Sequence, residues 1–152
     1  MPTIITRAAG SLKSMGFAGK TSNVPGAPTI GTATATGSTT ATVAFTAPAS
    51  NGGAVITSYT ATSSPGGITG TLSQAGSGTI TVTGLTGGTA YTFTVVATNA
   101  QGTGPASSAS NSVTPNVVPG APTIGTATAT GQTTASVTFT APSANGGTAV
   151  TG

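Results

Sequence analysis

The run Leu85-Thr86-Gly87-Gly88-Thr89-Ala90-Tyr91-Thr92-Phe93-Thr94-Val95-Val96-Ala97-Thr98-Asn99 decides the fold of this chain. From Tyr91 onward, aromatic and aliphatic side chains mostly alternate with threonine. Successive side chains of a β-strand point to opposite faces, so this two-residue period predicts a strand with one buried face. The Gly87-Gly88 pair predicts a turn, because glycine adopts backbone conformations that other residues avoid.

The same alternation occurs in two earlier segments. Val43 and Phe45 alternate with small polar neighbours, and so do Ile80 and Val82. Glycine- and proline-containing turns separate the segments, at 48–53, 64–67, 87–88 and 102–105. About seven short strands with frequent turns and no helical periodicity are typical of an all-β sandwich.

An internal repeat covers both ends of this pattern. Residues 24–58 align with 118–152 at an offset of 118 − 24 = 94 residues, and nine of the 35 positions differ. We therefore expect a complete sandwich over 24–116 and the first two strands of a second, incomplete sandwich over 117–152. Because a two-stranded hairpin is marginal alone in water, we expect either that the natural chain continues or that another chain completes the sheet.

These residues resemble the fibronectin type III domain, an immunoglobulin-like β-sandwich. The resemblance rests on the run quoted above and on Val24-Pro25-Gly26-Ala27-Pro28, Asn51-Gly52-Gly53, Ile56-Thr57-Ser58-Tyr59 and Gly102-Thr103-Gly104-Pro105. It implies a structural corner made by Leu85 and Tyr91, in which the tyrosine hydroxyl bonds to the backbone upstream. Many members place tryptophan where this chain has Phe45 and Phe139, so the resemblance implies a thinner core of the same plan.

The alternation also predicts which side chains form the core. Tyr59 and Tyr91 fall at inward positions, so we expect core tyrosines and not rings that stack on sugars. The larger core members are expected to be Ile30, Val43, Phe45, Ile56, Tyr59, Leu72, Ile80, Val82, Leu85, Tyr91, Phe93, Val95 and Val113.

The composition excludes most catalytic chemistry. Thr, Ala, Gly and Ser number 36, 25, 24 and 16, whereas Asp, Glu, His, Cys and Trp are absent. General acid-base catalysis and metal coordination depend on those missing side chains. We therefore expect no enzyme activity, no cofactor and no metal. No run of about 18 apolar residues occurs, so we expect no membrane insertion.

The only charged side chains are Arg7, Lys13 and Lys20, and all three lie in the first twenty residues. A nucleic-acid surface needs a clustered basic face with stacking aromatics, so we expect no nucleic-acid binding. Residues 1–23 are too short to fold alone and order only by docking on a partner. One interpretation of this segment is a disordered tail, and the other is an anchoring peptide. The expected anchoring side chains are Ile4, Ile5, Arg7, Leu12, Lys13, Met15, Phe17 and Lys20.

The segment Arg7-Ala8-Ala9-Gly10-Ser11-Leu12-Lys13-Ser14-Met15-Gly16-Phe17 is similar to the openings of phage tail and fibre proteins with fibronectin-like repeats. This resemblance implies a structural, adhesive protein of the virion. Its partners would be other virion proteins, further copies of the chain and host surface glycans. The alternative is a bacterial cell-surface adhesin or an accessory module of an extracellular polysaccharide-active enzyme.

Overall fold

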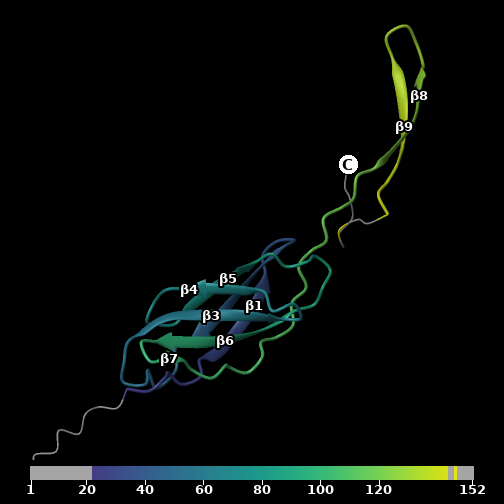
Figure 1. Cartoon of the computed structure of the whole chain (residues 1–152). Coiled ribbons are helices and arrows are strands. Elements are labelled where there is room, and N and C mark those ends of the chain that lie inside the picture. Colours follow the sequence, from purple (N-terminus) through teal and green to yellow (C-terminus); the bar gives the residue numbers. More distant parts are fainter. Residues whose placement is uncertain (1–21, 144–145, 147–152) are drawn as a thin grey trace, which may run out of the picture.

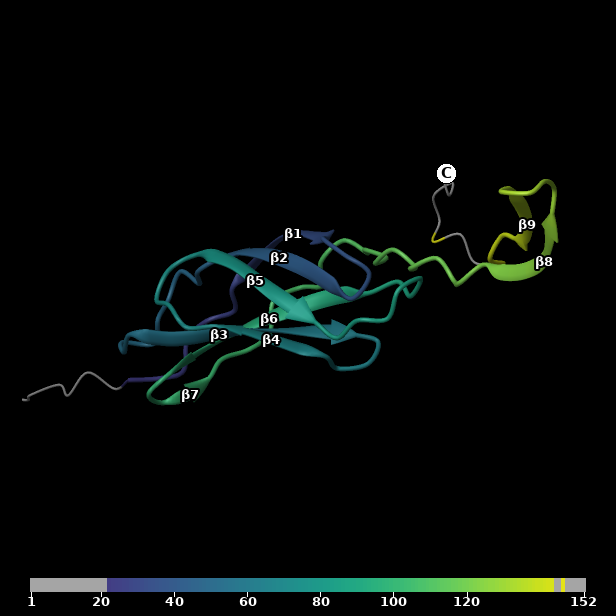
Figure 2. The same cartoon turned by 90° about the horizontal axis from the view of Figure 1, so that it is seen from above.

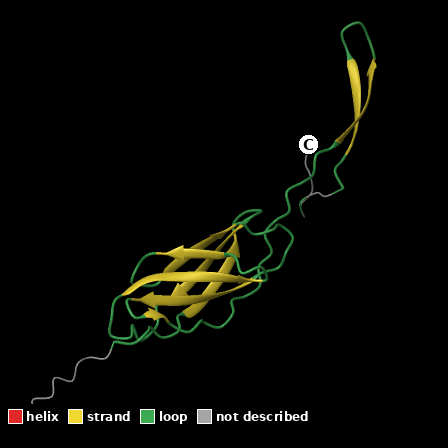
Figure 3. Cartoon of the chain, viewed as in Figure 1, coloured by secondary structure: helices red, strands yellow, loops and turns green. Residues whose placement is uncertain are grey.

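The computed structural model describes residues 22–143 and 146, and in this part of the chain every regular element is a strand (Figures 1 and 3). One sheet has the order β1-β2-β5 and a second has the order β4-β3-β6-β7. Their strands are β1 (Thr29–Ala35), β2 (Thr40–Thr46), β3 (Ile56–Ser64), β4 (Thr69–Leu72), β5 (Gly78–Thr83), β6 (Thr92–Asn99) and β7 (Gly102–Thr103). The expected all-β sandwich is confirmed.

The two sheets form two layers with the core between them (Figure 2). Along β6, Phe93, Val95 and Ala97 are buried, and so are Val43 and Phe45 on β2. Every second side chain of these strands is therefore buried, as the two-residue period of the sequence predicts. Pairing within one sheet would leave one face of these strands in water, so the burial of these side chains depends on the facing sheet.

Aromatic rings link the two layers. The Phe45 and Tyr59 ring centroids lie 4.3 Å apart across the core, and Tyr59 is fully buried. Its hydroxyl donates a hydrogen bond to the Ala75 carbonyl at 3.0 Å, so the buried polar atom is satisfied. Phe45 is 4 % exposed. A buried phenylalanine therefore occupies the core position at which many family members have tryptophan.

Three expected core residues are only partly buried. Ile30 lies on β1 and Leu72 on β4, which are edge strands of their sheets, so each lacks a neighbouring strand on one side. Val113 lies in the segment after β7 and forms one isolated bridge with Tyr91. The other members of the expected core are buried.

The turn at Asn51-Gly52-Gly53 brings the start of the sandwich against the loop between β2 and β3. The Asn23 N–H donates to the Gly52 carbonyl at 2.7 Å. Gly52 has a φ of 72°, and a Cβ there would collide with the Asn23 carbonyl oxygen. Both the backbone angle and the close approach therefore require glycine at this position.

Beyond this sandwich, β8 (Thr123–Ala129) and β9 (Ala135–Thr140) form a separate two-stranded sheet (Figure 1). Its register copies that of β1 and β2: Ile124 lies opposite Phe139 as Ile30 lies opposite Phe45, and both pairs of strands then shift register. No residue of β8 or β9 is buried. The repeated sequence therefore forms the same hairpin in two different environments.

Candidate functional site

The described part of the chain encloses no pocket, contains no cluster of potential metal ligands and includes no helix long and apolar enough to span a membrane. Its side chains are all uncharged, because Arg7, Lys13 and Lys20 precede residue 22. The candidate sites within it are therefore surfaces. The eight side chains expected to anchor the protein, from Ile4 to Lys20, lie outside the described residues.

Leu85 and Tyr91 lie together at one end of the sandwich. Leu85 is 2 % exposed, and its N–H donates to the Thr39 carbonyl at 3.0 Å, in the turn between β1 and β2. The Tyr91 hydroxyl oxygen accepts a hydrogen bond from the Thr86 N–H, also at 3.0 Å. This bond favours the ionised phenol, and it lowers the pKa of Tyr91 below the ordinary tyrosine value.

Tyr59 lies in the opposite electrostatic setting. Its burial between the sheets disfavours the phenolate and raises the pKa of the side chain. Neither Tyr59 nor Tyr91 offers a ring to a ligand, since both are buried as expected. The two tyrosines are parts of the scaffold.

Asn99, at the end of β6, ties three segments together. Its amide nitrogen donates to the Asn23 and Asn51 carbonyls, each at 2.8 Å, and its side-chain oxygen accepts from the Gln101 N–H at 2.8 Å. Asn99 is 4 % exposed, so these bonds lie where unpaired polar groups would be costly. Sequence reasoning missed this residue, because its partners are backbone atoms up to 76 positions away.

Asn111 joins the end of the domain to its first strand. Its side-chain oxygen accepts from the Ala33 N–H at 2.8 Å, and its amide donates to the Ala33 carbonyl at 3.0 Å. Ala33 is next to the register shift in β1, so the side chain supplies bonds that a regular neighbouring strand would give. Sequence reasoning also missed this residue.

Serine side chains hold the segment after β7 against β6. The Val95 N–H donates to the Ser107 hydroxyl at 2.9 Å, and the Phe93 N–H donates to the Ser110 hydroxyl at 3.0 Å. The N–H groups of the same serines donate to the Val95 and Phe93 carbonyls. A repeat of serine three residues apart is the signal that could have identified this arrangement.

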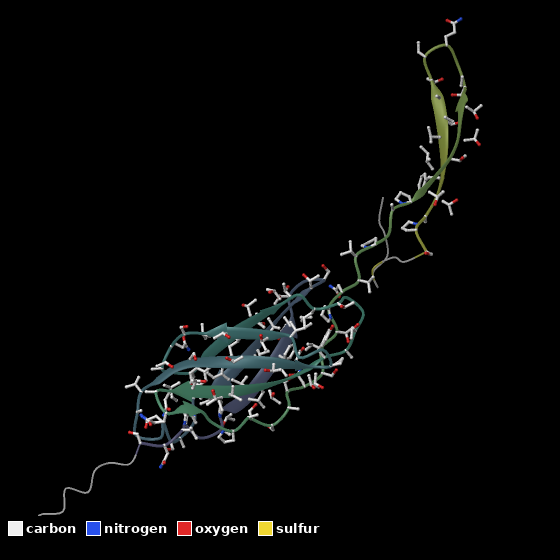
Figure 4. The ribbon with its side chains drawn as sticks, viewed as in Figure 1. Atoms are coloured by element: carbon white, nitrogen blue, oxygen red, sulfur yellow. The ribbon has the colours of Figure 1, made fainter. Side chains whose placement is uncertain are left out.

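Hydroxyl groups cover the outer faces of the sandwich (Figure 4). Thr60 and Thr71 pair across β3 and β4 with their hydroxyls 3.3 Å apart, and Thr98 and Thr103 pair across β6 and β7 at 2.9 Å. Such faces can exchange neutral hydrogen bonds with a ligand but offer no ion pair.

The outstanding surface of the described residues is the apolar face of β8 and β9. Ile124 is 75 % exposed, Val137 is 51 % exposed and Phe139 is 72 % exposed. In the first repeat the equivalents of Val137 and Phe139, Val43 and Phe45, are 0 % and 4 % exposed, and the equivalent of Ile124, Ile30, is partly buried. Within the described residues nothing covers Ile124, Val137 and Phe139.

Two facing β-sheets, with the corner made by Leu85 and Tyr91 at one end, define the class of this protein as an immunoglobulin-like β-sandwich. Residues 26–113 match the family model of the fibronectin type III domain. The chain belongs to this family. No curated protein matches it.

Several solved structures are similar to the sandwich. The titin kinase with its flanking domains is 26 % identical with a TM-score of 0.52, and the match covers 61 % of this chain and 17 % of that one. A crystal structure of titin domains is 28 % identical with a TM-score of 0.51, over 60 % of this chain and 32 % of that one. The FN1–FN3 domains of chicken CNTN1 are 23 % identical with a TM-score of 0.52, over 65 % and 37 %, which shows the fold alone.

Proposed function

We propose that this protein is a structural and adhesive component of a bacteriophage particle, either a tail fibre, a tail-associated protein or a capsid decoration. In this proposal the N-terminal segment docks on other virion proteins, and fibronectin type III modules project from the particle. The single observation that carries it is the repeated hairpin, which is the mark of modules arranged in series. The extended layout of sandwich and hairpin suits a spacer (Figure 1).

The surface chemistry supports a role in an ordered assembly. Free proteins use net charge to stay apart and charged edge strands to prevent sheets from pairing. The described surface lacks charge and instead presents threonine hydroxyls such as those of Thr60 and Thr71. We propose that these faces touch host surface glycans through neutral hydrogen bonds, without catalysis. Many weak contacts on one particle add up to useful avidity.

The docking segment is proposed from its side chains. Its apolar groups, including Ile4, Leu12 and Phe17, would pack on a partner, while Arg7 and Lys13 would meet acidic groups there. This arrangement needs no cofactor and no metal. Other virion proteins and further copies of the chain are the proposed partners.

Immunogold labelling tests the location directly. Antibodies raised against residues 24–116 should label a fixed position on the tail or capsid of purified particles. Labelling of the bacterial envelope instead would support the alternative, an adhesin or an accessory module of a polysaccharide-active enzyme, and would overturn the virion assignment.

A pair of leader variants tests the docking. Phe17→Ser should lower the number of copies per particle in a quantitative immunoblot, because it removes the largest apolar side chain of the segment. Ser14→Ala is the matched control, since Ser14 is not among the expected anchoring residues, and it should leave the copy number unchanged. Equal incorporation of both variants would contradict the docking role.

A further inference from the structure

The turn between β2 and β3 contains a chemically reactive pair of residues, Asn51 and Gly52. The backbone nitrogen that follows an asparagine can attack the carbon of the side-chain amide, and glycine favours this attack because it has no Cβ to shield the nitrogen. Asn145 also precedes a glycine but lies outside the described residues. The other four asparagines precede residues that carry a Cβ: Asn23, Asn99, Asn111 and Asn116.

The fold itself requires the glycine of this pair. Gly52 has a φ of 72°, and a Cβ there would collide with the Asn23 carbonyl oxygen. A bulkier residue, which would slow the attack, is therefore excluded at position 52. Ser50 and Asn51 are exposed, so water reaches the side-chain amide and ammonia can leave.

Two hydrogen bonds arrange the reacting groups. The Asn51 Oδ1 accepts from the Gly53 N–H at 2.9 Å, and this donor can stabilise the negative charge that develops on the oxygen during attack. The Gly52 N–H donates to the Ser50 hydroxyl at 3.2 Å, and no main-chain carbonyl of the described residues accepts from it. Attack by this nitrogen therefore breaks no hydrogen bond between main-chain groups.

We propose that Asn51 is a site of spontaneous deamidation, at which the folded chain converts its own side-chain amide to a carboxylate. The Gly52 nitrogen bonds to the side-chain carbon and gives its proton to water, while the side-chain nitrogen takes up a proton and leaves as ammonia. Water then hydrolyses the cyclic imide. Cleavage at the former side-chain carbon gives an aspartyl residue. Cleavage at the main-chain carbon gives an isoaspartyl residue, in which the chain runs through the former side chain.

The two products differ in their effect on Asn99, whose amide donates to the Asn51 main-chain carbonyl at 2.8 Å. The aspartyl product keeps this carbonyl, and its carboxylate can still accept from the Gly53 N–H. In the isoaspartyl product this carbonyl has become a free carboxylate, and the main chain is longer by a methylene group. The Asn99 contact then loses its geometry. Conversion to this product therefore loosens the end at which the chain enters the sandwich.

The composition makes the reaction easy to follow. The chain contains no Asp or Glu, so each conversion lowers its formal net charge of +3 by one. Incubation of the folded full chain at mildly alkaline pH should yield a species that elutes earlier from a cation exchanger. Endoproteinase Asp-N has no aspartate to cut in the fresh chain and should cut the aspartyl product before position 51. Isoaspartyl methyltransferase should label the other product, and fragment masses separate position 51 from Asn145.

Matched variants assign the reaction to this residue. Asn51→Gln should slow conversion at position 51 about tenfold or more, because glutamine must close a larger ring. The control Asn116→Gln changes an exposed asparagine that precedes a valine, and it should leave conversion at position 51 unchanged. A synthetic peptide with the sequence of residues 48–55 gives the rate without the fold. The folded chain should react within about tenfold of this peptide.

Thermal unfolding tests the consequence for the sandwich. The purified isoaspartyl form should melt about 4 °C below the fresh protein, whereas Asn51→Asp, which reproduces the other product, should melt within about 1 °C of it. An isoaspartyl form that melts with the fresh protein would overturn the proposed effect on Asn99. Deamidation at Asn51 itself would be overturned if the folded chain stayed unchanged at position 51 while the peptide converted. Loss of charge at an undiminished rate in Asn51→Gln would likewise assign the reaction to other residues.

Discussion

The hairpins β1–β2 and β8–β9 share sequence and register but differ in what covers them. Phe45 is 4 % exposed beneath the facing sheet, whereas Phe139, its equivalent, is 72 % exposed. The pairing of the strands is therefore encoded locally, in the turn and in the alternation, while burial depends on strands elsewhere in the chain. An identical apolar face is part of the core in the first hairpin and is exposed in the second.

The largest expected effect separates the two phenylalanines. Phe45→Ala should lower the free energy of unfolding of the sandwich by about 3 to 5 kcal/mol, because it leaves a cavity beside Tyr59. Phe139→Ala should leave that free energy within about 0.5 kcal/mol of its original value. Tyrosine fluorescence in a denaturant titration measures both, since the only tyrosines, Tyr59 and Tyr91, lie in the sandwich. Similar losses in both variants would show that the second hairpin packs on the first domain.

The next effect concerns how the register shift is held in each hairpin. Asn111→Ala should destabilise the sandwich by about 1 to 2 kcal/mol, since the buried Ala33 N–H loses its partner. In the second hairpin the Thr126 N–H donates to the Thr138 hydroxyl instead, at 2.9 Å. Thr138→Ala should therefore speed hydrogen exchange near Thr126 and leave the sandwich unchanged. A stable Asn111→Ala variant would show that water replaces this side chain.

A smaller effect is expected at the corner that closes over the first hairpin. Tyr91→Phe removes the acceptor for the Thr86 N–H and should lower the melting temperature of the sandwich by about 4 °C. Calorimetry of the full chain, with Thr89→Ser as a neighbouring control, measures the shift. An unchanged melting temperature would mean that the hydroxyl contributes nothing to the corner.

The smallest expected effect appears at alkaline pH. Of the two hairpins, only β1–β2 packs against an ionisable ring, that of Tyr59. The folded state holds the Tyr59 proton more tightly than the unfolded state, so the protonated ring contributes to the free energy of unfolding. This contribution is complete below a pH of about 10 and is lost as the pH rises further. Tyr91 acts in the opposite direction, because its pKa is lowered on folding. Denaturant titrations between about pH 8 and 11 should therefore show that the free energy of unfolding falls as the pH rises. Tyr59→Phe should remove this fall, and Tyr91→Phe should make it steeper. A loss that persists in Tyr59→Phe would assign it to another group.

Most of the fold could be predicted from the alternation of apolar and polar residues. Val43, Phe45, Phe93 and Val95 are buried as their period predicts, because a strand with one covered face leaves a regular pattern in its sequence. Leu72 was expected in the core and is only partly buried, since the pattern does not reveal that β4 is an edge strand.

The polar contacts were beyond sequence reasoning. Asn99 and Asn111 bond to backbone atoms, which every residue possesses, so their partners leave no trace in the residue types. The exposed face of β8 and β9 was different, because the repeat itself predicted two strands within 117–152 that need further strands to cover them. What the sequence could not supply was the identity of that cover.

The contacts of Asn99 lie at the end where the chain enters the sandwich, and their position bears on how the molecule would carry tension. The chain enters the sandwich at the end where Asn23 is bound to Gly52 and Asn99, and it leaves toward β8 at the opposite end (Figure 1). A pull between the two ends therefore runs along the strands and loads their hydrogen bonds in shear. We expect such bonds to yield together and not one after another, so that under load the lifetime of the sandwich would be set by its unfolding rate.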